Sequence, residues 1–221
     1  MKTIKVTGKG MIRLRPDTTR ITITITGIYP EYSETIRHSS EDTESLKDII
    51  SDYGFERQDL KTLSFDVDAE YENYEENGIY KQRMVGYRYR HLLKIEFDSD
   101  NERLGKILYA LGNSELNPEI RLSYTVKDQE KAKNTLLGNA VNDAKEKAAV
   151  IASAAGVSIK DIQNIDYSWG EIDFEVRPMN RTLMKACAVS SDSIGASSYG
   201  MDIEPDDITV SDTVTVIWEI S

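Results

Sequence analysis

The residues of this chain that could do nucleophilic or metal chemistry are few and far apart in the sequence. There are two histidines, His38 and His91, and one cysteine, Cys187. A cysteine nucleophile needs a histidine beside it and a third group to orient that histidine, and the residues around Cys187 match no such signature. Zinc needs a close cluster of cysteine or histidine ligands, which these three residues do not form in the sequence. The sequence therefore predicts no catalytic residue, no cofactor and no metal site.

A run of acidic residues beginning at Asp66 has the spacing of possible calcium ligands, because an acidic side chain recurs at every second position. A calcium loop needs glycine at its sixth position and glutamate at its twelfth, where this chain has Tyr71 and Asn77. Strict alternation is typical instead of the solvated face of a strand. We therefore predict a strand whose acidic stripe is neutralised by Arg88 and Arg90 of the next strand.

Gly8-Lys9-Gly10 is the one glycine-rich stretch near the start of the chain that invites comparison with a phosphate-binding loop. Such a loop needs a further glycine and a helix directly after it, and neither follows here. We interpret the two glycines as a bulge or bend in a strand.

Tyrosines gather around one predicted hairpin. The chain has twelve tyrosines, and four of them are candidate residues of an oligomer interface: Tyr71, Tyr74, Tyr80 and Tyr87. Tyrosine buries a large area while keeping a polar tip, which suits an interface and the edge of a core equally well. The sequence leaves both roles open.

The elements that must position these residues follow from hydrophobic periodicity. Alternation predicts strands at residues 19–26, 58–71, 85–97, 120–126, within 162–176 and at 208–220. Steps of three and four predict helices at 30–53, from Ser99 or Asp100 to Gly112, and at 128–155. The last helix has an alanine-rich stripe that predicts close packing on a sheet: Ala132, Leu136, Ala140, Ala144, Ala148, Ile151 and Ala155.

The two long strands around Gly78 predict a hairpin arm of fixed register that mediates self-association. About 14 residues per strand at roughly 3.3 Å each give an arm of ~45 Å. Pairing even positions with even positions centres the turn near Gly78 and sets Asp68 opposite Arg88 and Asp66 opposite Arg90. The outer half of such an arm needs cover from another chain.

Composition excludes some partners. The 27 basic and 38 acidic side chains give a net charge of −11, which disfavours nucleic acid and anionic membranes. No segment has the ~18 uninterrupted apolar residues that would insert into a bilayer. The first ten residues lack the apolar core of a signal peptide, so we expect a cytoplasmic protein, or a periplasmic or secreted one if a leader was removed.

The order of these landmarks resembles the SIMPL-domain family, known from bacterial periplasmic immunogenic proteins and of undefined biochemistry. The resemblance covers most of the chain except roughly residues 177–199. It rests on Gly8, Gly10, Pro16-Asp17, Asp59-Leu60-Lys61-Thr62, Glu70-Tyr71, Gly86-Tyr87, residues 140–148, Ala155-Gly156 and the last strand. Two features depart from the family: the absence of a signal peptide, and Pro205-Asp206 where members often have Pro-Gly.

The resemblance implies an α+β fold with an antiparallel sheet domain built from both chain ends and a ferredoxin-like α/β sandwich. It also implies assembly into rings in some members, a loose link to stress tolerance, and no catalytic residues. We assign residues 1–75 with 205–221 to the sheet domain, 80–175 to the ferredoxin-like domain, and 177–204 to a long loop. The alternating strand at 208–220 is too apolar for a free tail and should pair with an opening strand.

Two functions are compatible with these observations. The first is a non-enzymatic, self-associating protein, a homo-oligomeric scaffold related to stress. The second is a small-ligand-binding protein or an enzyme, with a site in a cleft between the two parts that tyrosines and Arg88 or Arg90 would line. A large apolar symmetric contact would favour the first, and a polar pocket with shifted ionisations the second.

Overall fold

The computed structural model describes residues 2–167, 170, 172–178 and 203–221. The loop expected at 177–204 lies almost entirely outside these residues, as does Cys187. In chain order the elements are β1 (Lys2–Leu14), β2 (Thr18–Tyr29), α1 (Tyr32–Ser51), a short 3₁₀ turn η1 (Arg57–Asp59), β3 (Lys61–Glu76), β4 (Ile79–Asp98), α2 (Asn101–Gly112), β5 (Glu119–Thr125), α3 (Gln129–Ala154), β6 (Ile159–Asp166) and β7 (Ile208–Ile220).

The strands form two antiparallel sheets, in the orders β1-β7-β6 and β3-β4-β2-β5, which with three helices confirm the α+β class. The contacts divide the described chain into two compact units. Unit 1 contains Met1–Asp17, Thr125–Val176 and Pro205–Ser221, and unit 2 contains Thr18–Tyr124. Within the described residues, no helix is both long and apolar enough to cross a membrane.

The boundary between the units differs from the one that the sequence analysis placed after residue 75. Unit 2 has the βαββαβ order and the sheet order β3-β4-β2-β5 of a ferredoxin-like fold. The ferredoxin-like part therefore comprises residues 18–124 rather than 80–175. β2 belongs to it because its isoleucines pair with apolar residues of β4, as in Ile21↔Ile95 and Ile23↔Leu93.

The last strand pairs with the first, which confirms the prediction that β7 joins an opening strand. The antiparallel register is continuous from Lys2↔Ile220 to Leu14↔Ile208. The alternating side chains of β7 place Val214, Val216 and Trp218 in the core of unit 1. The sheet built from both chain ends is thus present, without residues 18–75.

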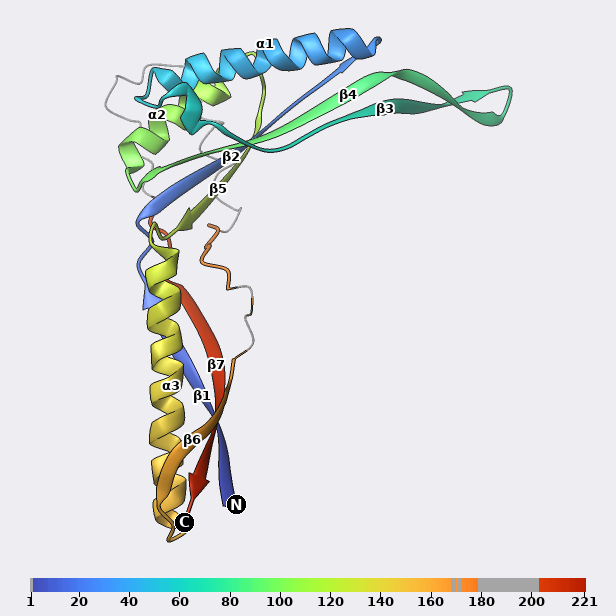
Figure 1. Cartoon of the computed structure of the whole chain (residues 1–221). Coiled ribbons are helices and arrows are strands. Elements are labelled where there is room, and N and C mark those ends of the chain that lie inside the picture. Colours follow the sequence, from blue (N-terminus) through green and yellow to red (C-terminus); the bar gives the residue numbers. More distant parts are fainter. Residues whose placement is uncertain (1, 168–169, 171, 179–202) are drawn as a thin grey trace. The chain divides into compact units, whose positions relative to one another are not determined.

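The core of unit 1 is a close contact between α3 and β1, which lie along each other in Figure 1. A Cβ added to Gly8 would lie 2.1 Å from the carbonyl oxygen of Ala140, and one added to Gly10 would lie 2.1 Å from that of Leu136. The register of β1 with β7 has no shift at these positions. The bulge predicted there was wrong, because the glycines instead leave room for the helix backbone.

The alanine stripe of α3 is confirmed from Ala132 to Ala148, all buried. Its last two expected members are not: Ile151 is 48% exposed, and Ala155 is exposed as well. Ala152 takes the buried position in the final turn. The buried positions continue at steps of four residues from Ala132 to Ala152, so the stripe does not move back by one residue in the last turn.

The core of unit 2 lies between the sheet and the two helices that cover one of its faces. The fully buried side chains of unit 2 include Ile21, Ile23 and Ile25 of β2, Leu93 and Ile95 of β4, Leu46 and Ile50 of α1, and Leu104 of α2. Asp100, one of the two predicted caps of α2, accepts a hydrogen bond from the backbone N–H of Arg103 at 3.0 Å.

Candidate functional site

The hairpin of β3 and β4 extends well beyond the rest of its sheet. β2 pairs with β4 only as far as Tyr29↔Tyr87, whereas β3 and β4 remain paired as far as Glu76↔Ile79. The outer part is therefore a two-stranded ribbon (Figure 1). We call residues 70–86 of this ribbon the arm.

The predicted register holds in the inner half of the hairpin. Asp66 lies opposite Arg90, and Asp68 lies opposite Arg88. The same even-to-even pairing was wrong for the arm, where Tyr71 lies opposite Met84 after a shift of one residue.

The turn explains this shift. Asn77 and Gly78 both have positive φ, 55° and 76°, as a two-residue type I′ turn requires. This turn sets Glu76 opposite Ile79, so odd positions of one strand meet even positions of the other. A bulge beside Gly86 absorbs one residue and restores the inner register.

One face of the arm carries ion pairs. Side chains directly opposite each other share a face, and alternate residues of each strand lie on opposite faces. The charged face is defined by Glu70, Glu72, Tyr74, Glu76, Ile79, Lys81 and Arg83, of which Ile79 is 61% exposed beside the turn. On it, Arg83 pairs with Glu72 and Lys81 with Glu76. Arg88 donates two hydrogen bonds to Glu70, at 2.9 and 2.6 Å, which hold the pKa of Glu70 below its usual value.

The opposite face, the tyrosine face, consists of Tyr71, Asn73, Tyr80, Gln82 and Met84, with Glu75 beside the turn. None of its first five side chains is charged. Tyr71, Tyr80 and Met84 are 57%, 79% and 44% exposed. Tyrosine and methionine are enriched at protein interfaces and charged residues are depleted, so this face has the composition of one.

The tyrosine face lies on the side of the sheet where α1 packs. Phe65 lies on that face of β3 and meets His91 edge-on, with ring centroids 5.1 Å apart. Tyr71 follows on the same face by alternation. Helix α1 begins at Tyr32, whose ring contacts Tyr87 at the base of the arm. No described helix covers the arm beyond that point.

The structure brings three of the four candidate tyrosines to one side. Tyr71 and Tyr80 lie on the tyrosine face, and Tyr87 lies at its base. Tyr74 lies on the charged face, with the guanidinium of Arg83 5.4 Å from its ring centroid. Strand alternation along β3 places Tyr74 on the other side from Tyr71, so the four candidate tyrosines do not share one face.

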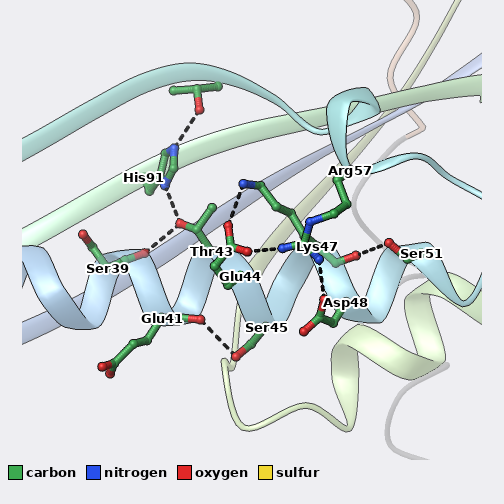
Figure 2. A network of polar contacts seen from close by, with 11 residues as sticks. Ser39, Glu41, Thr43, Glu44, Ser45, Lys47, Asp48, Ser51, Arg57 and His91 are labelled. Carbon is green, nitrogen blue, oxygen red and sulfur yellow. Dashed lines mark hydrogen bonds and ion pairs between the residues drawn. The ribbon is translucent and has the colours of Figure 1, made fainter.

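The second candidate is the network around His91 (Figure 2). Its Nδ1 lies 3.0 Å from the hydroxyl of Thr43 on α1, and its Nε2 lies 2.9 Å from the hydroxyl of Thr62 on β3. Because Thr43 donates its proton to the carbonyl of Ser39 at 2.7 Å, we assign the ring proton to Nδ1. Nε2 then accepts a hydrogen bond from the hydroxyl of Thr62. In an enzyme, such a hydroxyl could act as a nucleophile and such a ring nitrogen as its base.

The electrostatics of this network favour a structural role. Burial and the nearby Lys47 ammonium lower the pKa of His91, so the imidazolium that a nucleophilic step would create is disfavoured. No carboxylate is hydrogen-bonded to the ring in the described structure. The histidine instead joins α1, β3 and β4. Its threonine partners are distant in the chain, so the sequence gave no signal of this network.

The other histidine and the remaining polar groups form no further site in the described residues. His38 stacks on Tyr29 at 4.0 Å and pairs with Glu41 at 3.2 Å. A shallow hollow is lined by Asp59, Lys61, Lys94 and Glu96. Within the described part of the chain, no three His, Cys, Asp or Glu side chains are placed to hold a metal ion.

Comparison with known protein families identifies the family to which the chain belongs. The model of the SIMPL family, described as a protein of unknown function (DUF541), matches residues 4–218. The chain belongs to the SIMPL family. The match spans both units and the arm of this SIMPL protein, and confirms the resemblance noted in the sequence. No curated protein shows significant similarity to the chain.

His91 makes the stability of this SIMPL protein depend on pH. Because folding lowers the pKa of His91 below its usual 6.5, the unfolded chain binds a proton more readily. The contribution of neutral His91 to the free energy of unfolding is fully present above about pH 6.5. It is lost as the pH falls towards the pKa that His91 has in the folded state. Urea unfolding between pH 5 and 8 should show a free energy of unfolding that declines below pH 6.5, by at most about 1.4 kcal/mol per pH unit for one proton.

The variant His91→Gln should lose this part of the decline, whereas His38→Gln should keep it. An unchanged pH profile in His91→Gln would assign the decline to other groups.

Proposed function

We propose that this SIMPL protein is a non-enzymatic, self-associating protein whose arm binds a second copy of the chain. The carrying observation is the division of the arm into a face of ion pairs and an exposed tyrosine face. A ribbon of two strands is marginally stable alone and gains from being covered. The wider role as a stress-related scaffold rests on the family resemblance alone.

The composition of the tyrosine face supports this proposal over a purely solvated arm. An arm without a partner would be expected to carry charges on both faces, as edge strands generally do. Here the ion-paired side chains lie on one side, the other side carries Glu75 as its charged residue, and Tyr71 and Tyr80 are open to solvent. Large exposed apolar groups of this kind mark interaction surfaces.

The alternative function, ligand binding or catalysis by tyrosines with Arg88 or Arg90, has less support. Arg88 is held by Glu70 through two hydrogen bonds. Arg90 lies opposite Asp66 on the face away from α1, not beside Tyr71 or Tyr87. These arginines and tyrosines therefore do not converge on one site within unit 2.

The test is to weaken the tyrosine face and measure assembly. The double variant Tyr71→Ser with Tyr80→Ser should associate at least tenfold more weakly than the unmodified protein, because buried tyrosines often contribute about 1–2 kcal/mol each to a contact. The matched control is Tyr74→Ser, which removes the same side chain from the charged face and should change association by less than about threefold. Light scattering after size exclusion, over a concentration series, measures the mass.

An unmodified protein that keeps the 25.0 kDa monomer mass at every concentration contradicts the proposal. Equal weakening by Tyr74→Ser would show that the tyrosine face is not the contact.

A further inference from the structure

We infer that two copies of the chain pack tyrosine face to tyrosine face, with antiparallel arms related by a two-fold axis at Asn73 and Gln82. The inference rests on the proposed self-association and adds its geometry. It follows from three features of the arm: the charge of its edges, the order of residues on the tyrosine face, and the area that this face offers.

The acidic row of β3 disfavours pairing of two copies through their β3 edges. β3 is the terminal strand of its sheet, and its outer edge has no strand partner in the described structure. Its residues Asp66, Asp68, Glu70, Glu72 and Glu76 lie on one face. Two β3 strands placed side by side would bring two such rows together, and like charges on neighbouring strands are destabilising. A contact through the tyrosine face leaves both acidic rows in water and keeps the ion pairs of Glu70, Glu72 and Glu76 within each copy.

The order of residues on the tyrosine face fixes the centre of a symmetric contact. Three cross-strand pairs follow one another from base to tip: Tyr71↔Met84, Asn73↔Gln82 and Glu75↔Tyr80. In an isologous contact, the axis passes through the middle of the shared surface. That middle is the pair Asn73 and Gln82, whose amide groups can donate and accept hydrogen bonds across the axis.

This arrangement places apolar groups together on both sides of the axis. The tip residue Tyr80 of one copy then lies over the partner's Tyr71 and the partner's Met84. Further along the same line is the start of α1, where Tyr32 and Ile36 are 54% and 37% exposed. The charged Glu75, which is opposite Tyr80, lies at the same level on the outer side of the two-stranded contact, where water can solvate it.

The size of the contact sets its strength. Three large side chains and two amides per copy bury on the order of 1,000 Å² in total, the lower end for specific interfaces. We therefore expect a dimer that dissociates on dilution in the micromolar range.

Cysteine cross-linking tests the geometry. The variant Asn73→Cys, in a Cys187→Ser background, places two thiols at the axis on sheet faces that pack about 10 Å apart, a gap that a short bis-maleimide cross-linker spans but a disulfide does not. The cross-linker should convert most of the protein to a covalent dimer at concentrations where the unmodified chain is dimeric. The matched control Tyr74→Cys lies on the next position of β3 but on the charged face, and should give less than a tenth of that yield.

The outcomes separate this inference from the proposed function. Association by light scattering without cross-linking at position 73 overturns the two-fold geometry and leaves self-association standing. A monomeric protein overturns both. Equal cross-linking at positions 73 and 74 overturns the assignment of the tyrosine face as the contact.

Discussion

Replacing Gly8 with valine is expected to unfold unit 1. Even a Cβ at this position would lie 2.1 Å from the carbonyl oxygen of Ala140 and 2.4 Å from the nitrogen of Ala144. Both are backbone atoms of α3, so no change of rotamer relieves the clash. The helix would have to leave the strand, exposing the core around Val214 and Trp218. We expect a loss of at least about 3 kcal/mol, the upper range for overpacking.

Gly138 provides a control on the same helix. A Cβ there meets nothing within 4 Å among the described residues, and glycine inside a helix is less favourable than alanine by about 1 kcal/mol. Gly138→Ala should therefore raise the free energy of unfolding, while Gly8→Val lowers it. Calorimetry measures both. A Gly8→Val variant that melts like the unmodified protein would show that α3 does not lie on β1 as described.

Replacing Gly86 with alanine is expected to distort the base of the arm. Gly86 has a φ of 151°, and a Cβ there would lie 2.3 Å from the carbonyl oxygen of Tyr29. Strain and clash together should cost about 2–4 kcal/mol. Because the neighbouring bulge joins the two registers of the hairpin, the same substitution should also weaken self-association.

Gly112, at the end of α2, is the matched control in unit 2. A Cβ there has nothing within 4 Å in the described structure, so Gly112→Ala should change the free energy of unfolding by less than about 1 kcal/mol. Urea unfolding followed by tyrosine fluorescence measures both variants. If the free energies of unfolding of Gly86→Ala and Gly112→Ala differ by less than their experimental errors, the backbone of Tyr29 does not restrict position 86.

The sequence determined what depends on local pattern. Alternation located β2 and β7, and three- and four-residue steps located α1 and α3, because periodicity records which side chains must be buried. The family could be identified because the order and spacing of short motifs are properties of the chain alone. The pairs Asp66↔Arg90 and Asp68↔Arg88 were predictable because the apolar side chains of both strands must lie on the same face. This requires even-numbered residues of β3 to be opposite even-numbered residues of β4.

The tertiary structure decided what depends on contacts distant in the chain. Periodicity showed that β2 is half buried, but not that its partner is β4 rather than β1, and the expected boundary between the units moved as a result. The type I′ turn and the bulge changed the parity of the arm, and with it the face on which Tyr80 lies, because Tyr80 is opposite Glu75 rather than Glu76. The role of Gly8 was likewise visible only in the structure, where the backbone of α3 occupies the space that a Cβ would need. The sequence shows that a side chain is absent there but not which atoms lie against the glycine.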